Sequence, residues 1–69
     1  MPLTMSPQGT EQEIVRINGR DKTREFLSSL GFVAGEKVVV VNEMAGNVII
    51  NVKGSRIALD RTMANRIIV

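Results

Sequence analysis

Four carboxylates in the first half of the chain are spaced in pairs that could bind a hard divalent cation. Glu11 and Glu13 fall on one face of an extended segment, and Asp21 and Glu25 lie one helical turn apart. Selective sites for first-row transition metals use histidine or cysteine, and the chain has neither. Such pairs are equally typical of solvated strand ends and helix caps. We therefore predict no metal site and no cofactor.

Nucleophilic catalysis would depend on a serine, because the sequence contains no cysteine. A catalytic serine needs a neighbouring base and a group that orients that base, and the usual base, histidine, is absent. Ser28 and Ser29 fall in an expected helix, and Ser55 falls in an expected turn. The sequence therefore predicts no catalytic residues and no enzymatic activity.

The pattern of charge and aromatic residues argues against a nucleic-acid partner. Nine basic and seven acidic residues give a formal charge of +2, and the basic residues are scattered apart from a loose cluster between Arg20 and Arg24. The glycines lie at separate turns and match no phosphate-binding loop. Tyr and Trp are absent, and Phe26 and Phe32 are expected to pack around a helix rather than against bases.

No segment reaches the roughly 20 apolar residues that span a bilayer. The first residues also lack the basic and apolar regions of a signal peptide. These features predict a cytoplasmic protein without membrane insertion. Its length predicts a single domain over residues 1–69.

The expected elements follow from short apolar runs bounded by turn residues. Leu3 and Met5 would point to one side of an extended lead-in and contact the core. The segments predicted as strands are 13–18, 36–43, 48–53, 56–59 and 66–69. Turns are expected at Met44–Asn47 and at Gly54–Ser55.

One amphipathic helix is predicted over Asp21–Leu30, with Thr23, Phe26, Leu27 and Leu30 on one face. Asp21 would cap its start and Gly31 its end. A single further helical turn, capped by Asp60, is expected before the last strand. Five short strands with tight turns predict a mainly β fold, a small, partly open barrel with one helix after the first strand.

The sequence also resembles a known family. The segment Phe26-Leu-Ser-Ser-Leu-Gly-Phe-Val-Ala-Gly35, followed by the valine-rich strand, is similar to the "LxxLGLxPG" core of FeoA domains. The segment Gly54-Ser-Arg-Ile-Ala-Leu-Asp60 with Ala64 and the last strand resembles the closing hairpin of that family. Ala34 replaces the family's turn proline, and the Met44–Asn47 loop lacks its usual proline-containing sequence.

The resemblance implies an SH3-like barrel and a role in bacterial ferrous iron uptake. FeoA proteins act beside FeoB, the Fe(II) permease whose cytoplasmic part binds GTP. This chain would then be an accessory or regulatory protein that acts by contact with a FeoB-type permease. Two alternatives stay open: a stand-alone relative of the SH3-like domain of iron-dependent repressors, and a small RNA-binding barrel.

Four residues are candidates for the protein contact, because each combines an anchoring residue type with expected exposure. They are Arg24, Phe32, Met44 and Arg61. Together they would mark a surface formed by the end of the helix and the neighbouring turns.

Overall fold

The computed structural model describes residues 1–69 as six strands and three short helices. The strands are β1 (Glu11–Glu13), β2 (Arg16–Ile17), β3 (Lys37–Met44), β4 (Asn47–Val52), β5 (Ser55–Asp60) and β6 (Ile67–Ile68). The helices are the 3₁₀ helix η1 (Leu3–Met5), α1 (Lys22–Ser29) and α2 (Arg61–Ala64). The mainly β architecture agrees with the sequence prediction, with six strands in place of five.

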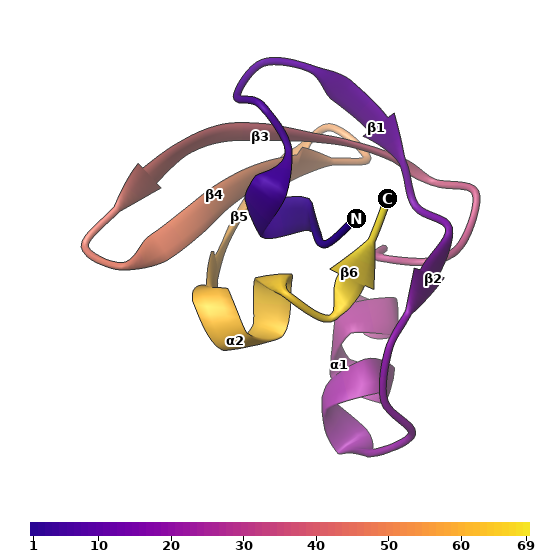
Figure 1. The fold of residues 1–69 in the computed structure, drawn as a ribbon. Coiled ribbons are helices and arrows are strands. Elements are labelled where there is room, and N and C mark those ends of the chain that lie inside the picture. Colours follow the sequence, from indigo (N-terminus) through magenta and orange to yellow (C-terminus); the bar gives the residue numbers. More distant parts are fainter.

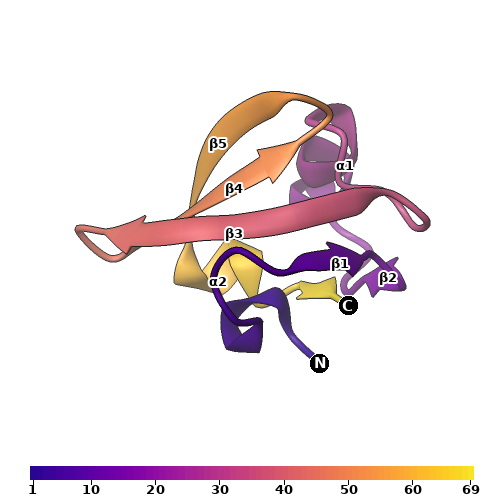
Figure 2. The same ribbon diagram turned by 90° about the horizontal axis from the view of Figure 1, so that it is seen from above.

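The strands form two antiparallel sheets that curve around one core (Figure 1). The larger sheet has the order β1–β3–β4–β5, and β2 pairs with β6 in the smaller one. Seen from above, β3 runs across the whole molecule, with α2 and β6 beneath it (Figure 2). The two chain ends meet beside β6, where Met1 and Val69 exchange backbone hydrogen bonds of 2.7 and 2.8 Å.

Alternating apolar residues of the β3–β4 hairpin supply five of the 13 core residues. In β4, Val48, Ile50 and Val52 are buried at every second position, as expected for a strand with one face inward. Val38 and Val40 of β3 face the same core. The register of β3 and β4 shifts between Val40 and Asn42, so the valine run is interrupted by a bulge. Helices α1 and α2 add Leu27 and Ala64 to this core.

The predicted first strand is divided in two, which was not expected from its continuous apolar pattern. The amide of Ile14 donates to the carbonyl of Glu36, and its carbonyl accepts from the amide of Gly35. The amide of Val15 instead donates to the carbonyl of Ile68 at 2.7 Å. Two successive residues thus bond to opposite sides of the barrel. The strand prediction over 13–18 was wrong on this point, because periodicity does not report a change of pairing partner.

The first residues form the 3₁₀ helix η1 rather than an extended segment. As a result, the side chains of Leu3 and Met5 do not face the same side, contrary to the prediction. Leu3 is fully buried, but Met5 is 70% exposed. An extended segment brings residues i and i+2 to one side, while a 3₁₀ turn rotates them by roughly two-thirds of a circle. The prediction for Met5 was therefore wrong.

The hairpin between β4 and β5 turns one residue earlier than predicted. Val52 pairs with Ser55, so the two turn residues are Lys53 and Gly54, and both have positive φ. Positive φ at both positions is the requirement of the turn that matches strand twist, and glycine meets it without strain. The turn at Met44–Asn47 was predicted correctly, and Met44 pairs with Asn47 across Ala45 and Gly46.

Both predicted helices are present. Helix α2 begins as predicted, because the Asp60 carboxylate accepts a 2.7 Å hydrogen bond from the backbone amide of Met63. Helix α1 ends at Ser29 with Leu30 as its C-cap, and Gly31 follows with a φ of 106°, as predicted for the end of the helix. Within α1 only Leu27 is fully buried, and Phe26 is 49% exposed. The expectation that Phe26 packs into the core was wrong, because the helix presents a narrower face than its apolar pattern indicated.

Candidate docking site

Arg24 lies on α1 and borders two adjoining hollows. The first has a volume of about 430 Å³ and is lined only by polar or charged residues, which are Arg20, Asp21, Arg24, Glu25 and Ser28. Arg24 and Ser28 also line the second, so the two hollows share one wall. One side of α1, with the residues just before it, thus presents two arginines and a hydroxyl to solvent.

The second hollow has a different chemical character. Its volume is about 150 Å³, and it lies between α1, β2 and the segment that follows the helix. Its apolar lining residues are Ile17, Phe32, Val33 and Ala34, and Arg16 with Arg24 supplies charge at its edge. An apolar surface bordered by cations suits a partner side chain that is apolar and flanked by carboxylates.

A bidentate ion pair fixes the start of α1 to the opposite end of the chain. Arg66, just before β6, donates from its two Nη atoms to the Asp21 carboxylate at 2.7 and 3.2 Å. The hydrogen bond from Arg66 is the main reason that the pKa of Asp21 is lowered. Asp21 is the capping residue of α1 by position, but its carboxylate makes no capping hydrogen bond. The predicted cap was therefore wrong in its side-chain contact.

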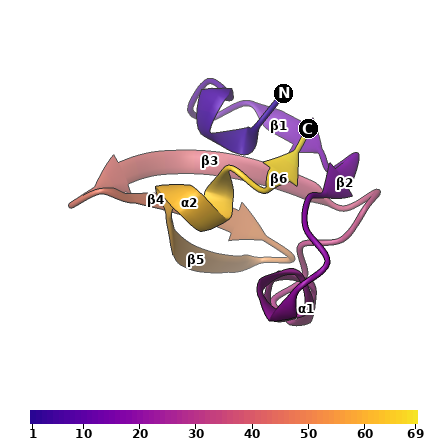
Figure 3. The same ribbon diagram turned by 60° about the horizontal axis from the view of Figure 1, so that its bottom comes forward.

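Gly19 makes room for this ion pair. A Cβ at Gly19 would collide with Nη1 of Arg66, and the φ of Gly19 is 96°. The loop that contains Gly19 therefore passes close to the Arg66 side chain. Figure 3 shows this loop running from β2 to the start of α1. Arg24 of α1 and Arg16 of β2 line the same second hollow.

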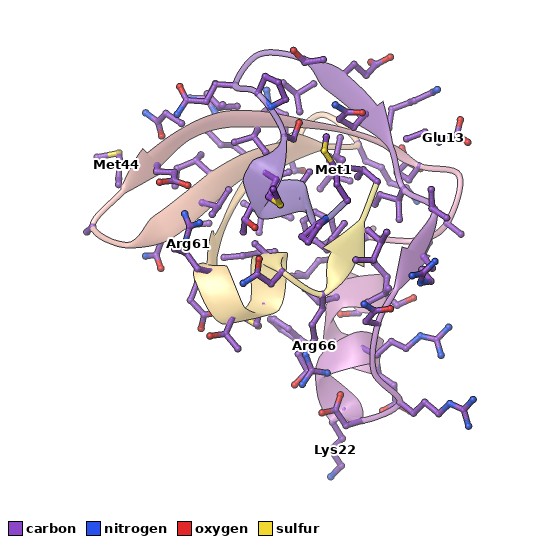
Figure 4. All side chains as sticks on the ribbon, viewed as in Figure 1. Met1, Glu13, Lys22, Met44, Arg61 and Arg66 are labelled. Carbon is purple, nitrogen blue, oxygen red and sulfur yellow. The ribbon has the colours of Figure 1, made fainter.

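Met44 and Arg61 lie together at the other end of the molecule. Met44 is 62% exposed at the tip of the β3–β4 hairpin. The neighbouring Glu43 accepts a hydrogen bond from Nη1 of Arg61 in an exposed ion pair. Figure 4 shows Met44 and Arg61 on one side, well apart from Lys22 at the start of α1.

The four predicted contact residues do not form one surface. Arg24 is exposed on α1, whereas Met44 and Arg61 are exposed at the hairpin end. Phe32 is fully buried, so its expected exposure was wrong and its aromatic ring contributes to the core. Phe32 follows the helix directly, and its amide donates to Leu27, which folds the chain back into the protein.

The carboxylate pairs considered for metal binding are partly occupied by basic side chains. Glu13 accepts a 3.0 Å hydrogen bond from Lys37, which raises the pKa of Lys37, aided by the charge of the same carboxylate. Asp21 is held by Arg66. No group of three or more metal-ligating side chains is present. No helix is long and apolar enough to cross a membrane.

Arg16 and Arg20 were not predicted as site residues, although they border the hollows. The loose basic cluster from Arg20 to Arg24 was the available signal. Arg16 joins that cluster only because β2 packs beside α1, and sequence spacing does not report this contact.

Comparison with known proteins decides the family. The FeoA domain model matches residues 1–69. A candidate Fe(2+) transport protein A from Methanocaldococcus jannaschii is 35% identical over 68 residues, which are 99% of this chain and 83% of that protein. The chain belongs to the FeoA family. The family is one of ferrous iron transport, as the sequence resemblance implied.

Solved structures of FeoA proteins share the fold. The FeoA of Stenotrophomonas maltophilia, solved with zinc and described as a prokaryotic SH3 domain protein, has a TM-score of 0.87 and 27% identity. The match covers 99% of this chain and 87% of that one. The predicted SH3-like fold is therefore confirmed.

A manganese-dependent transcriptional repressor shares the same fold. It gives a TM-score of 0.84 at 20% identity, and the match covers 97% of this chain but 39% of the repressor. At this identity the likeness concerns the fold alone. This chain thus shares its fold with one part of that repressor.

Proposed function

We propose that this chain is a non-enzymatic accessory protein of Fe(II) uptake that acts by contact with the cytoplasmic part of a FeoB-type permease. The observation that carries the proposal is the match of the FeoA domain model to residues 1–69, together with the similarity to an Fe(2+) transport protein A. The S. maltophilia relative is described as a candidate activating factor for ferrous iron transport. The proposal gives this chain the same activating role and a cytoplasmic location.

The side chains of the molecule support contact rather than chemistry. Two of the four carboxylates considered as ligands are paired with basic side chains, Glu13 with Lys37 and Asp21 with Arg66. The hollow beside α1 combines arginines with hydroxyl and carboxylate groups, and its Ser28 has no histidine beside it to act as a base. Exposed arginine and methionine side chains are typical of protein interfaces.

Uptake of radioactive ⁵⁵Fe(II) by cells tests this function. We expect removal of the gene to lower the initial uptake rate severalfold, and the wild-type chain to restore it. The same comparison in cells that lack the permease is the control, and there the chain should have no effect. Equal uptake with and without the chain in permease-containing cells would contradict the proposal.

The two alternatives predict other partners. A stand-alone relative of the repressor domain is supported by the shared fold. Helix α1 packs on the core through Leu27, however, so this helix is not free to enter a DNA groove. A small RNA-binding barrel predicts affinity for RNA that falls steeply with added salt. Fluorescence anisotropy with a labelled single-stranded RNA at low salt distinguishes this class, since the accessory role predicts no saturable binding.

A further inference from the structure

We propose that the two adjoining hollows beside α1 form one docking groove for an acidic segment of a partner protein, with Arg16, Arg20 and Arg24 binding its carboxylates. The inference deepens the proposed function and rests on it for the source of the segment, which is the cytoplasmic part of the permease. The groove consists of the residues that line the two hollows.

The charges of the groove favour an acidic occupant. Arg16, Arg20 and Arg24 are exposed, and none of them lies within 4.0 Å of a carboxylate oxygen, whereas Arg61 and Arg66 are each paired. Asp21 is already engaged by Arg66. Among the groove residues, only the carboxylate of Glu25 has no basic partner, whereas three arginines have no carboxylate partner. An arginine guanidinium binds a carboxylate through two parallel hydrogen bonds, so these side chains are suited to glutamate or aspartate.

The shape of the groove adds an apolar requirement. The smaller hollow, of about 150 Å³, has Val33 and Ala34 among its lining residues, above the buried Ile17 and Phe32. A peptide that places one aliphatic side chain there would bring its neighbouring carboxylates to Arg16 and Arg24. The groove therefore fits an acidic segment with an apolar residue inside it, in keeping with a buried centre and a charged rim.

A nucleic acid or nucleotide fits the groove less well. Base recognition on single strands uses exposed aromatic faces, and the only aromatic residue of the groove, Phe32, is fully buried. Phe26 is exposed but lines neither hollow. The groove can bind carboxylates but offers no exposed aromatic face on which a base could stack.

The walls of the groove are held in place before any partner arrives. Arg66 ties the start of α1 to the barrel through Asp21, and Leu27 anchors the middle of the helix in the core. Both contacts leave Arg20 and Arg24 on the solvent side. A preformed groove loses less conformational entropy on binding.

A peptide titration tests the groove without the permease. The probe is a short synthetic peptide of glutamates around one central leucine, added to the ¹⁵N-labelled chain and followed by NMR. We expect saturable shift changes confined to α1, β2 and the segment 32–34, weakening severalfold when salt rises from about 50 to about 300 mM. The matched peptide with glutamine for glutamate should bind much less. Equal binding of both peptides, or shifts centred on the β3–β4 hairpin, would overturn the inference.

Two matched arginine variants test the groove with the permease. Arg24→Glu reverses a groove charge and Arg61→Glu reverses a hairpin-end charge, so both change the net charge equally. We expect Arg24→Glu to weaken binding to the permease's cytoplasmic part about tenfold, and Arg20→Glu with Arg24→Glu to weaken it further. Arg61→Glu should stay within about twofold of the wild type, because it lies outside the groove.

The outcomes separate the groove from the proposed function. If the wild type binds the permease and Arg24→Glu binds equally well, the groove is wrong and the function stands. If the wild type does not bind the permease but the acidic peptide binds in the groove, the proposed partner is wrong and the acidic-segment site stands. Tighter binding of a single-stranded RNA than of the peptide at the same residues would overturn the acidic-segment assignment. An unchanged urea midpoint in each variant shows that its fold is intact.

Discussion

The absence of a side chain at Gly19 determines where the guanidinium of Arg66 can lie. The guanidinium of Arg66 occupies the space that a Cβ at residue 19 would fill, and from there it reaches both oxygens of Asp21. The arginine therefore links α1 to the strand that closes the barrel. The position of Asp21 before the helix predicts a cap, which is a local pattern, but the carboxylate pairs with Arg66, 45 residues away.

Substitution of Gly19 tests this arrangement. Gly19→Ala should destabilise the fold by about 1 kcal/mol through its left-handed φ alone, with a further loss from displacement of Arg66. Gly9→Ala is the matched control, because Gly9 also has positive φ but a Cβ added there would meet nothing within 4 Å. Urea denaturation should show the larger loss for Gly19→Ala. Equal losses would mean that the contact with Arg66 contributes nothing.

The Asp21–Arg66 pair also predicts a pH dependence. The folded pKa of Asp21 lies below its ordinary value of 3.8, so the unfolded chain takes up a proton first as the pH falls. The stabilisation is complete above the unfolded value and is lost as the pH drops through the folded one. In urea titrations between about pH 5 and about pH 2.5, Asp21→Asn should lose less stability than the wild type. Parallel curves for the two proteins would contradict this role.

Among the elements, those set by local signals were predicted more accurately than those that depend on distant partners. The β3–β4 turn and α2 follow from local signals, Ala45–Gly46 and the Asp60 cap. The division of β1 from β2 depends on hydrogen bonds of Ile14 and Val15 to opposite sides of the barrel, which no local pattern encodes. For the same reason Arg16, which lines the second hollow, was not among the predicted contact residues.

Helix α1 offers a direct test of which apolar residue holds it. Leu27 is fully buried and Phe26 is 49% exposed, although both belong to the predicted apolar face. Leu27→Ala should lower the free energy of unfolding by about 2–5 kcal/mol, because it leaves a cavity in the core. Phe26→Ala should cost less than about 1 kcal/mol, as is usual for exposed positions. Chemical denaturation gives both values, and a larger loss for Phe26→Ala would refute the packing described for α1.

At the scale of the whole molecule, the barrel separates two exposed surfaces. One contains Met44 and the Glu43–Arg61 ion pair at the hairpin end, and the other contains the unpaired arginines beside α1. The apolar core lies between these two surfaces, and the charged side chains of both surfaces stay exposed to solvent. A small fold of this kind can present a contact surface without changing its own structure.

Calorimetry tests the proposal that this FeoA-family chain acts by binding the permease. Purified chain is titrated into the purified cytoplasmic part of the FeoB-type permease from the same organism. We expect saturable binding with a dissociation constant of about 100 μM or tighter, which is typical of a small transient interface. Absence of saturable binding, confirmed by unchanged NMR spectra of the labelled chain at the same concentrations, would contradict it.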